Sequence, residues 1–324
     1  MAPGGADGLL GRVAATGLLQ EGRPVVVLLS GGRDSVCLLA VARLLGAEVS
    51  ALHVDYGLRE ASREDAEHCE ALCARLEVPL TVERARRPDD APGNLQAWAR
   101  DVRYGAGARL ATAAGADLAT GHTRTDQAET VLYRLAASPG RRALLGMAPR
   151  SGRLVRPLLD VTREETAAFC RARELAWRED ASNASPAFAR SRVRHGLLPA
   201  MQAVDERAEA NIVRTAELLR DEAEVLDVVV DTALAGRDCI TVDHLRALPR
   251  AVARLVVRRL AEDATGHLCA RAPGRLDDLL ELGGHRPAKP GGLWALDLGD
   301  GARAEIRLGT LRMVPTPRPG ARTG

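Results

Sequence analysis

A run of apolar residues ends abruptly in two glycines near the start of the chain, and this junction constrains the fold more than any other stretch. Residues 25–29 (VVVLL) are apolar and mostly β-branched, which is typical of a parallel strand buried on both faces. Gly31 and Gly32 then allow a sharp turn that brings backbone N–H groups close to a bound anion. A helix is expected to begin near Asp34 or Ser35, with its unpaired first N–H groups facing the turn. The junction therefore predicts an α/β fold with a phosphate site.

The side chains of this turn support the same prediction. Ser30 and Ser35 supply hydroxyl donors, whereas Asp34 would repel a phosphate unless a cation lay between them, most simply Mg²⁺. The turn is not a Walker A loop, because the GxxxxGK[ST] spacing is absent and the only lysine of the chain is Lys289. An ordinary glycine-rich turn between a strand and a helix is the simpler alternative.

The composition bounds the size and class of the protein. A chain of 324 residues with 46% hydrophobic content can bury the core of one large domain and one smaller domain. The net charge of +2 says little about a nucleic-acid partner. The six cysteines form no CxxC pair and no zinc-finger spacing, so reduced structural thiols are expected. No stretch suggests a membrane span, a signal peptide or a transit peptide, and we expect a cytoplasmic protein.

Strands and helices alternate after the first junction, which predicts a doubly wound, mainly parallel sheet with right-handed crossovers. The further strands are expected at residues 48–55, 80–82, 117–120 and 154–159. The strand at 117–120 runs directly into the polar segment 121–130 (GHTRTDQAET). Because the carboxyl ends of parallel strands line the ligand crevice, this segment and the glycine turn are expected to face one site. Residues 138–153 are rich in Gly, Pro and Arg and are expected to form a mobile loop. Thr162 and Glu165 form a capping-box pattern, which predicts that a helix begins there.

The pattern changes beyond residue 200. A long amphipathic helix near residues 204–226 is expected to link two domains. Short strands and helices follow from residue 240 to residue 314, which indicates a second, smaller α+β domain. We therefore predict a main domain at 1–200, a helical linker at 201–235, a small domain at 236–316 and a disordered tail at 317–324.

The motifs together resemble those of a known enzyme family. SGGRDS is similar to the SGGxDS signature of the PP-loop ATP pyrophosphatase superfamily, whose members release pyrophosphate from ATP and adenylate a substrate. The chain resembles bacterial tRNA(Ile)-lysidine synthases, in order, through SGGRDS, HVDYGLR, NLQAWARDVRY, GHTRTDQAET, RPLL, DASN and RSRVRHGLLP. This resemblance covers about residues 23–200 well and the smaller domain more loosely. It implies an adenine nucleotide alpha hydrolase-like catalytic domain that binds ATP, followed by a small tRNA-contacting domain.

The resemblance also implies a reaction and its partners. Members of this family use ATP to activate the wobble cytidine of a tRNA(Ile) with a CAU anticodon, and then attach L-lysine to cytidine C2. The products are lysidine, AMP and pyrophosphate, and the implied cofactors are ATP and Mg²⁺. No membrane partner is expected, and a homodimer is one assembly that the sequence leaves open.

The matched motifs carry the implied site residues. A catalytic role is implied for Asp34, Asp126, Glu129 and Arg194, with Asp34 also as the Mg²⁺ ligand. Contacts to ATP are implied for Ser30, Gly31, Gly32, Arg33, Asp34, Ser35, His53 and His122. Contacts to RNA or substrate are implied for Arg100, Arg103, Asp180, Asn183, Arg190 and Arg194. Because the ε-amine of lysine must attack as a neutral amine, a carboxylate is needed to position it or take its proton, and Asp126 and Glu129 are the candidates.

Simpler roles compete with these assignments. Asp126 and Glu129 stand near a helix start, where carboxylates commonly cap the helix or interact with its dipole. Arg190 and Arg194 instead suit a solvated basic helix end, with Asp180 as a partner.

Three positions depart from the family's motifs. Thr125 occupies the first of two positions that are usually aspartate, Tyr56 stands where histidine is common, and Ser191 replaces the usual asparagine. Two alternatives to a lysine ligase are a PP-loop tRNA thiolase, which predicts cluster or persulfide cysteines, and a non-catalytic RNA-binding relative.

Overall fold

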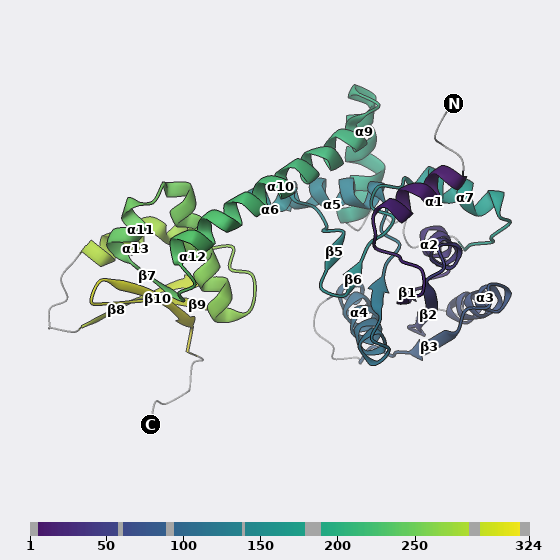
Figure 1. Cartoon of the computed structure of the whole chain (residues 1–324), viewed down its shortest axis with the longest axis horizontal. Coiled ribbons are helices and arrows are strands. Elements are labelled where there is room, and N and C mark those ends of the chain that lie inside the picture. The colour runs from purple at the N-terminus through teal and green to yellow at the C-terminus, as the bar shows by residue number, and fades with distance from the viewer. Residues whose placement is uncertain are drawn as a thin grey trace. The chain divides into compact units, whose positions relative to one another are not determined.

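The structure is a computed structural model that describes residues 6–57, 61–88, 94–137, 140–178, 189–284 and 292–317 (Figure 1). The chain divides into two compact units, Met1–Leu219 and Arg220–Gly324. The division falls within helix α10 (Ala208–Leu234). The boundaries expected at residues 200 and 236 stay a prediction. Residues 318–324 of the expected tail lie outside the described residues.

The first unit is built on a six-stranded sheet with the order β3-β2-β1-β4-β6-β5. Its strands are β1 (Pro24–Leu28), β2 (Glu48–Asp55), β3 (Leu80–Arg84), β4 (Asp117–Ala119), β5 (Arg150–Ser151) and β6 (Leu154–Val155). Neighbouring strands are parallel except for β5, which runs antiparallel to β6. The chain first adds β2 and β3 on one side of β1 and then adds β4 and β6 on the other side of β1. The predicted doubly wound, mainly parallel sheet is therefore confirmed.

The side chains of β1 alternate between two cores, which explains its unbroken apolar sequence. Val25 and Val27 belong to a core shared with four helices, whereas Val26 and Leu28 belong to a core on the opposite face. The first core is covered by α1 (Ala6–Ala15), α2 (Arg33–Leu44), α3 (Ala61–Arg75) and α7 (Arg163–Ala172), and the second by α4 (Leu95–Ala113) (Figure 1). Helices on both faces bury residues 25–28 of the strand, so no polar face is needed.

The remaining helices of the first unit follow β4. They are α5 (Arg124–Ala137), α6 (Arg141–Leu144), α8 (Ala189–Arg192), the π-helical segment η2 (Val193–Leu197) and α9 (Leu198–Val204). The loop predicted at 138–153 contains two short elements in its described part, α6 and β5, and its mobility stays a prediction. The buried amide of Gln127 holds this segment: its Nε2 donates to the Met147 carbonyl over 2.9 Å, and its Oε1 accepts from the Met147 N–H over 2.6 Å.

The second unit is a small α+β structure, as predicted. An antiparallel sheet with the order β7-β10-β9-β8 is formed by β7 (Cys239–Thr241), β8 (Leu293–Gly299), β9 (Ala302–Arg307) and β10 (Thr310–Pro315). Its helices are α11 (Val242–Ala247), α12 (Arg250–Thr265), the short η3 (Ala272–Arg275) and α13 (Leu276–Gly284). Alternate residues of β9, Ala302, Ala304 and Ile306, are buried in a core with the apolar side of α12. Across the described ranges, no helix has the length and apolar character needed to cross a membrane.

The capping box expected at the start of α7 is present and generates a stability prediction. Thr162 Oγ1 accepts from the Glu165 N–H over 3.1 Å, and the Glu165 carboxylate accepts from the Thr162 N–H over 2.8 Å. Thr162→Ala is expected to lower the free energy of unfolding by about 1 kcal/mol, because a helix donor loses its partner. Urea unfolding measures the change. The exposed Thr112→Ala in α4 is the control, and an equal loss in both variants would contradict the cap.

Candidate active site

The carboxyl ends of β1 and β4 border a cavity of about 780 Å³ in the first unit. The loop after β1 contributes Ser30, Gly32, Asp34 and Ser35, and the segment after β4 contributes Gly121, His122 and Thr125. Arg163 of α7 and Arg194 of η2 also line the cavity. The prediction that the glycine turn and the GHTRTDQAET segment face one site is therefore confirmed.

The turn after β1 has the backbone that an anion site requires. Gly31 adopts a φ of +78°, in the left-handed region that favours glycine, and Gly32 is the N-cap of α2. The two serine hydroxyls lie 3.1 Å apart, and Ser35 Oγ donates to the Gly32 carbonyl over 2.8 Å. These contacts hold the turn closed at the start of α2, where unpaired N–H groups and the helix dipole favour a negative ligand.

The segment after β4 touches the start of α2 through Gly121. A Cβ atom at residue 121 would lie 2.8 Å from the carbonyl oxygen of Asp34 and 3.0 Å from the backbone nitrogen of Ser35. Real side chains do not tolerate such a contact with backbone, so only glycine lets the two segments come this close. The glycine of the GHTRTD motif is thus required for the shape of the site.

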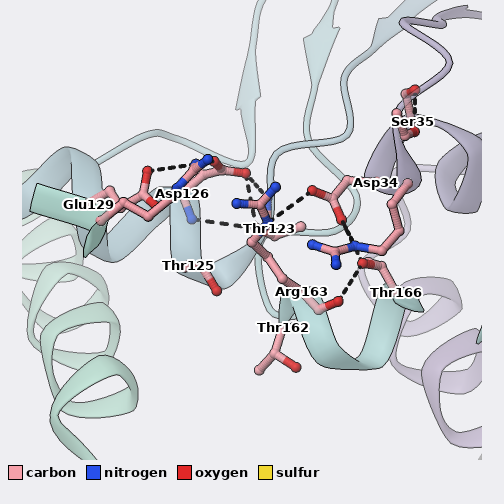
Figure 2. A network of polar contacts seen from close by, with 12 residues as sticks. Asp34, Ser35, Thr123, Thr125, Asp126, Glu129, Thr162, Arg163 and Thr166 are labelled. Atoms are coloured by element: carbon pink, nitrogen blue, oxygen red, sulfur yellow. Dashed lines mark hydrogen bonds and ion pairs between the residues drawn. The ribbon is translucent and has the colours of Figure 1, made fainter. Parts of the chain in front are cut away.

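Asp34 lies at the centre of a polar network between α2 and α7 (Figure 2). Its Oδ1 accepts from Thr166 Oγ1 over 2.5 Å and from Arg33 Nε over 3.2 Å, and Arg163 Nε lies 3.4 Å from its Oδ2. Mg²⁺ commonly binds one or two carboxylates together with substrate phosphates and water, and Asp34 beside a phosphate loop suits that pattern. Among the described residues, no cluster of three or more His, Cys, Asp or Glu side chains could hold a metal by itself. The role of Asp34 as a Mg²⁺ ligand stays a prediction.

Asp126 combines the two roles that its position in the sequence left open. One oxygen caps α5, because Oδ2 accepts from the backbone N–H and the hydroxyl of Thr123, each over 2.9 Å (Figure 2). The other oxygen, Oδ1, accepts from Arg194 Nη2 over 3.2 Å and lies 3.7 Å from Arg190 Nη2. Burial alone would raise the pKa of the Asp126 carboxyl, but the positive charge of Arg190 and the backbone N–H of Thr123 lower it below its usual value. Asp126 is therefore ionised at neutral pH.

Glu129 is fully buried and lies one helical turn beyond Asp126. Arg194 donates to both of its oxygens, from Nε to Oε1 over 2.5 Å and from Nη2 to Oε2 over 2.9 Å, and Arg190 Nε adds a contact of 3.3 Å. Burial would lower the pKa of the Arg194 guanidinium, but the Glu129 hydrogen bonds and the Asp126 charge raise it above its usual value. The structure thus brings together four predicted site residues as two carboxylates facing two guanidinium groups, a balanced network.

His122 is held as a neutral ring. Its Nδ1 lies 2.8 Å from Thr120 Oγ1. The pKa of His122 is lowered to about 4, chiefly by burial and also by the charges of Arg190 and Arg156, against the opposing effect of Asp126. A neutral imidazole offers one donor and one acceptor to a ligand in the cavity.

Thr125 contacts a carboxylate from a distant part of the chain. Its hydroxyl donates to Glu209 Oε1 over 3.2 Å, and Glu209, near the start of α10, lines the cavity. Burial raises the pKa of the Glu209 carboxyl, the Thr125 hydrogen bond opposes this, and the nearby charge of Glu164 raises it further. Within the described ranges, Glu209 forms no ion pair. It is therefore a carboxylate of the cavity without an ion-pair partner in the described part of the chain, although the charge of Arg124 favours its ionised form.

The chain is similar to known proteins over most of its length. A family model for the PP-loop domain matches residues 11–201. The tRNA(Ile)-lysidine synthase of Thermobifida fusca is 39% identical over 275 residues, which cover 81% of this chain and 85% of the relative. The tRNA(Ile)-lysidine synthase of Solibacter usitatus is 40% identical over 277 residues, which cover 82% of this chain and 62% of the relative.

The chain belongs to the tRNA(Ile)-lysidine synthase family. It spans only 62% of the length of the Solibacter usitatus relative and 57% of that of Thermus thermophilus. Among solved structures, the U34-tRNA thiolase NcsA from Methanococcus maripaludis is similar with a TM-score of 0.57 at 18% identity, over 66% of this chain and 78% of that one. This last likeness concerns the fold alone.

Other residues that the lysidine synthase motifs imply lie in different surroundings. Arg103 lines the cavity, whereas Arg100 lines a neighbouring pocket. His53 is buried in β2, with its Nδ1 2.9 Å from the Leu29 carbonyl oxygen, and it is not among the described residues that line the cavity. Asp180 and Asn183 lie outside the described residues. The functions of these residues stay predictions.

Three side chains of the site were missed from the sequence. Arg163 and Thr166 contact Asp34, and Glu209 contacts Thr125. The capping box at Thr162 marks the helix that carries the first two, but not the direction in which they point. Glu209 has no local signal, because it is one of several acids on an amphipathic helix.

The neutral His122 predicts a pH dependence of stability. Because the unfolded ring has a pKa of about 6.5, the unfolded chain binds a proton between about pH 6.5 and 4 that the folded chain does not. The stability at neutral pH should fall through this window by up to roughly 3 kcal/mol, and His122→Gln should remove that part of the fall. Urea unfolding of both proteins at about pH 7 and about pH 4.5 measures it, with the exposed His195→Gln as the control. A difference between wild type and His122→Gln that stays constant with pH would contradict a neutral ring.

Proposed function

We propose that the protein uses ATP to ligate L-lysine to C2 of the wobble cytidine of a tRNA(Ile) with a CAU anticodon, in the cytoplasm. The observation that carries the proposal is that one cavity is bordered by a phosphate loop at Ser30–Ser35, by Arg194, which Asp126 and Glu129 hold in place, and by the carboxylate of Glu209. Adenylation requires the loop, and binding of lysine requires charged groups that face the cavity. Relatives named tRNA(Ile)-lysidine synthase support this choice of substrates.

In the first step, the C2 oxygen of cytidine attacks the α-phosphorus of ATP, and pyrophosphate leaves. The N–H groups at the start of α2 and the hydroxyls of Ser30 and Ser35 are suited to the charge that builds on the leaving phosphates. Mg²⁺ bound at Asp34 would supply further positive charge to those phosphates. Thr166 and Arg163 orient the Asp34 carboxylate toward this task.

In the second step, the ε-amine of lysine attacks C2 of the adenylated cytidine, and AMP leaves. Lysine arrives as an ammonium ion and must lose a proton before it attacks. Asp126 and Glu129 are paired with Arg194, whereas Glu209 lines the cavity and forms no ion pair among the described residues, so we assign to Glu209 the contact with the amine and its proton. Asp126 and Glu129 then keep Arg194 in place, where its positive charge suits the carboxylate of lysine or the departing AMP.

A sulfur-transferring PP-loop enzyme is less well supported. Such chemistry needs reactive thiols at the site. Five of the six cysteines are buried, Cys239 belongs to the second unit, and none is among the described residues that line the cavity. Burial raises the pKa of Cys69 to about 12 and that of Cys73 to about 11, which makes both unreactive. The cysteines therefore favour lysine ligation over thiolation.

Incubation of the purified protein with Mg-ATP and labelled lysine tests the reaction directly. Label is expected in tRNA(Ile) with a CAU anticodon and not in elongator tRNA(Met). Label in neither RNA would refute lysine ligation and favour the alternative of a non-catalytic RNA-binding protein. Label in both would contradict the assigned tRNA.

Asp34→Asn is expected to slow release of pyrophosphate from ATP by about 100-fold or more, because Mg²⁺ would lose its carboxylate ligand and the phosphates would lose the positive charge of the metal. The amide keeps the hydrogen bond from Thr166, so the fold should be retained. Pyrophosphate release is the measurement. Asp160→Asn removes an exposed carboxylate that pairs with Arg124 outside the cavity, and it should release pyrophosphate normally. Normal release by the Asp34 variant would refute the phosphate-loop assignment.

Glu209→Gln is expected to raise the KM for lysine by about tenfold or more, because the ammonium loses an opposite charge while the Thr125 hydrogen bond is kept. The KM for ATP should stay unchanged. The acidic limb of the pH profile should also move, because Glu209 must be ionised to act. Glu206→Gln, an exposed acid close by in the chain, serves as the control. Equal KM values for lysine in both variants would instead assign the contact with the amine to Asp126 and Glu129.

A further inference from the structure

A second pocket, of about 660 Å³, lies in the first unit and is strongly positive. Its charged side chains are Arg100, Arg134, Arg156, Arg190 and Arg192. No carboxylate is among the described residues that line it. The pocket adjoins the charged network, because Arg190 lines it and also contacts Asp126 and Glu129.

Three of these arginines have no carboxylate partner in the described part of the chain. Arg134 donates to the Gly146 carbonyl over 2.7 Å, and Arg156 donates to the Ala148 carbonyl over 2.6 Å. Arg100 lies over the ring of Tyr104, with 4.6 Å from its Cζ to the ring centroid. Carbonyl and ring contacts fix the guanidinium groups without neutralising them, so their charge remains available to a ligand.

Burial makes this charge costly without an anion. Arg156 is only 8% exposed, and its Nε has no hydrogen-bond partner. Burial lowers the pKa of Arg134 and of Arg156, and the charge of Arg100 lowers both further. A buried guanidinium with a spare N–H and cationic neighbours is stabilised by an anion that accepts hydrogen bonds from several groups at once.

We propose that this arginine pocket binds phosphodiester groups of the substrate RNA next to the nucleotide that reacts. The planar forks of several arginines match the oxygens of a phosphate. Tyr133, which is 45% exposed, lines the same pocket and offers a ring on which an unpaired base can stack. The volume exceeds the needs of one phosphate and suits a nucleotide, while the loop after β1 already accounts for the phosphates of ATP. This inference rests on the proposed function, because it takes the RNA to be that substrate.

RNA binding without turnover tests the pocket. An anticodon stem-loop of tRNA(Ile) is titrated at several salt concentrations in the absence of ATP and lysine. Arg100→Gln and Arg134→Gln should each weaken binding about tenfold and make the slope of log K against log salt shallower by about 0.7. Arg109→Gln is the matched control, because Arg109 lies on the same helix as Arg100, pairs with Glu83 over 2.7 Å and does not line the pocket.

Tyr133→Leu separates stacking from charge. It should weaken binding about tenfold and leave the salt slope unchanged, because a base loses its ring but no phosphate loses a cation. Because Tyr133 is exposed on α5, its substitution should leave the fold intact, so weaker binding by this variant would not be due to misfolding.

A free phosphate is the other source of the same chemistry, and inorganic pyrophosphate is the probe for it. Loss of pyrophosphate binding in Arg100→Gln, with RNA affinity and salt slope equal to those of wild type, would overturn the proposal. Because the titration needs no catalysis, Arg100-dependent RNA binding without lysine transfer would contradict only the proposed function. Lysine transfer with unchanged RNA binding in all pocket variants would refute only the RNA-binding role of the pocket.

Discussion

The buried ion pair between Glu129 and Arg194 is the interaction on which the site depends. A fully buried carboxylate loses several kcal/mol of hydration, and only a well-aligned partner compensates for that loss. Arg194 meets this need with two hydrogen bonds, and Arg190 adds a third contact. The pair ties α5, which carries the segment after β4, to the basic segment at residues 189–199. Two motifs far apart in the sequence are thus joined at one wall of the cavity.

Features that depend on neighbouring residues were predictable from the sequence. The apolar run before Gly31 predicted β1, and the Thr162 capping box predicted α7, because strand burial and helix capping are read over a few positions. The direction in which a side chain points across the fold is not determined by its neighbours in the sequence. Thr166 reaches Asp34 across 132 positions, and Glu209 reaches Thr125 across 84. Only the packing of α7 and of α10 decides that these side chains point into the site.

The interpretation of the sequence missed that one side chain can make two separate contacts, as Asp126 and Gln127 do. Asp126 was weighed as either a cap or a site residue, but its two oxygens serve Thr123 and Arg194 separately. Gln127 was passed over, although its amide fixes Met147 and orders a segment that was expected to be mobile. A side chain with two polar atoms can satisfy a helix or loop with one and a ligand or partner with the other.

The charges around the cavity explain how the enzyme family's motif tolerates Thr125. The position is usually aspartate, and a carboxylate there would stand beside Asp126 and face Glu209. Like charges so close together would raise each other's pKa and favour protonation of one of them. A threonine instead donates its hydroxyl to Glu209, which favours the ionised carboxylate of Glu209 and adds no further negative charge to the site. The hydrogen bond from Thr125 thus leaves a carboxylate of α10, that of Glu209, facing the cavity.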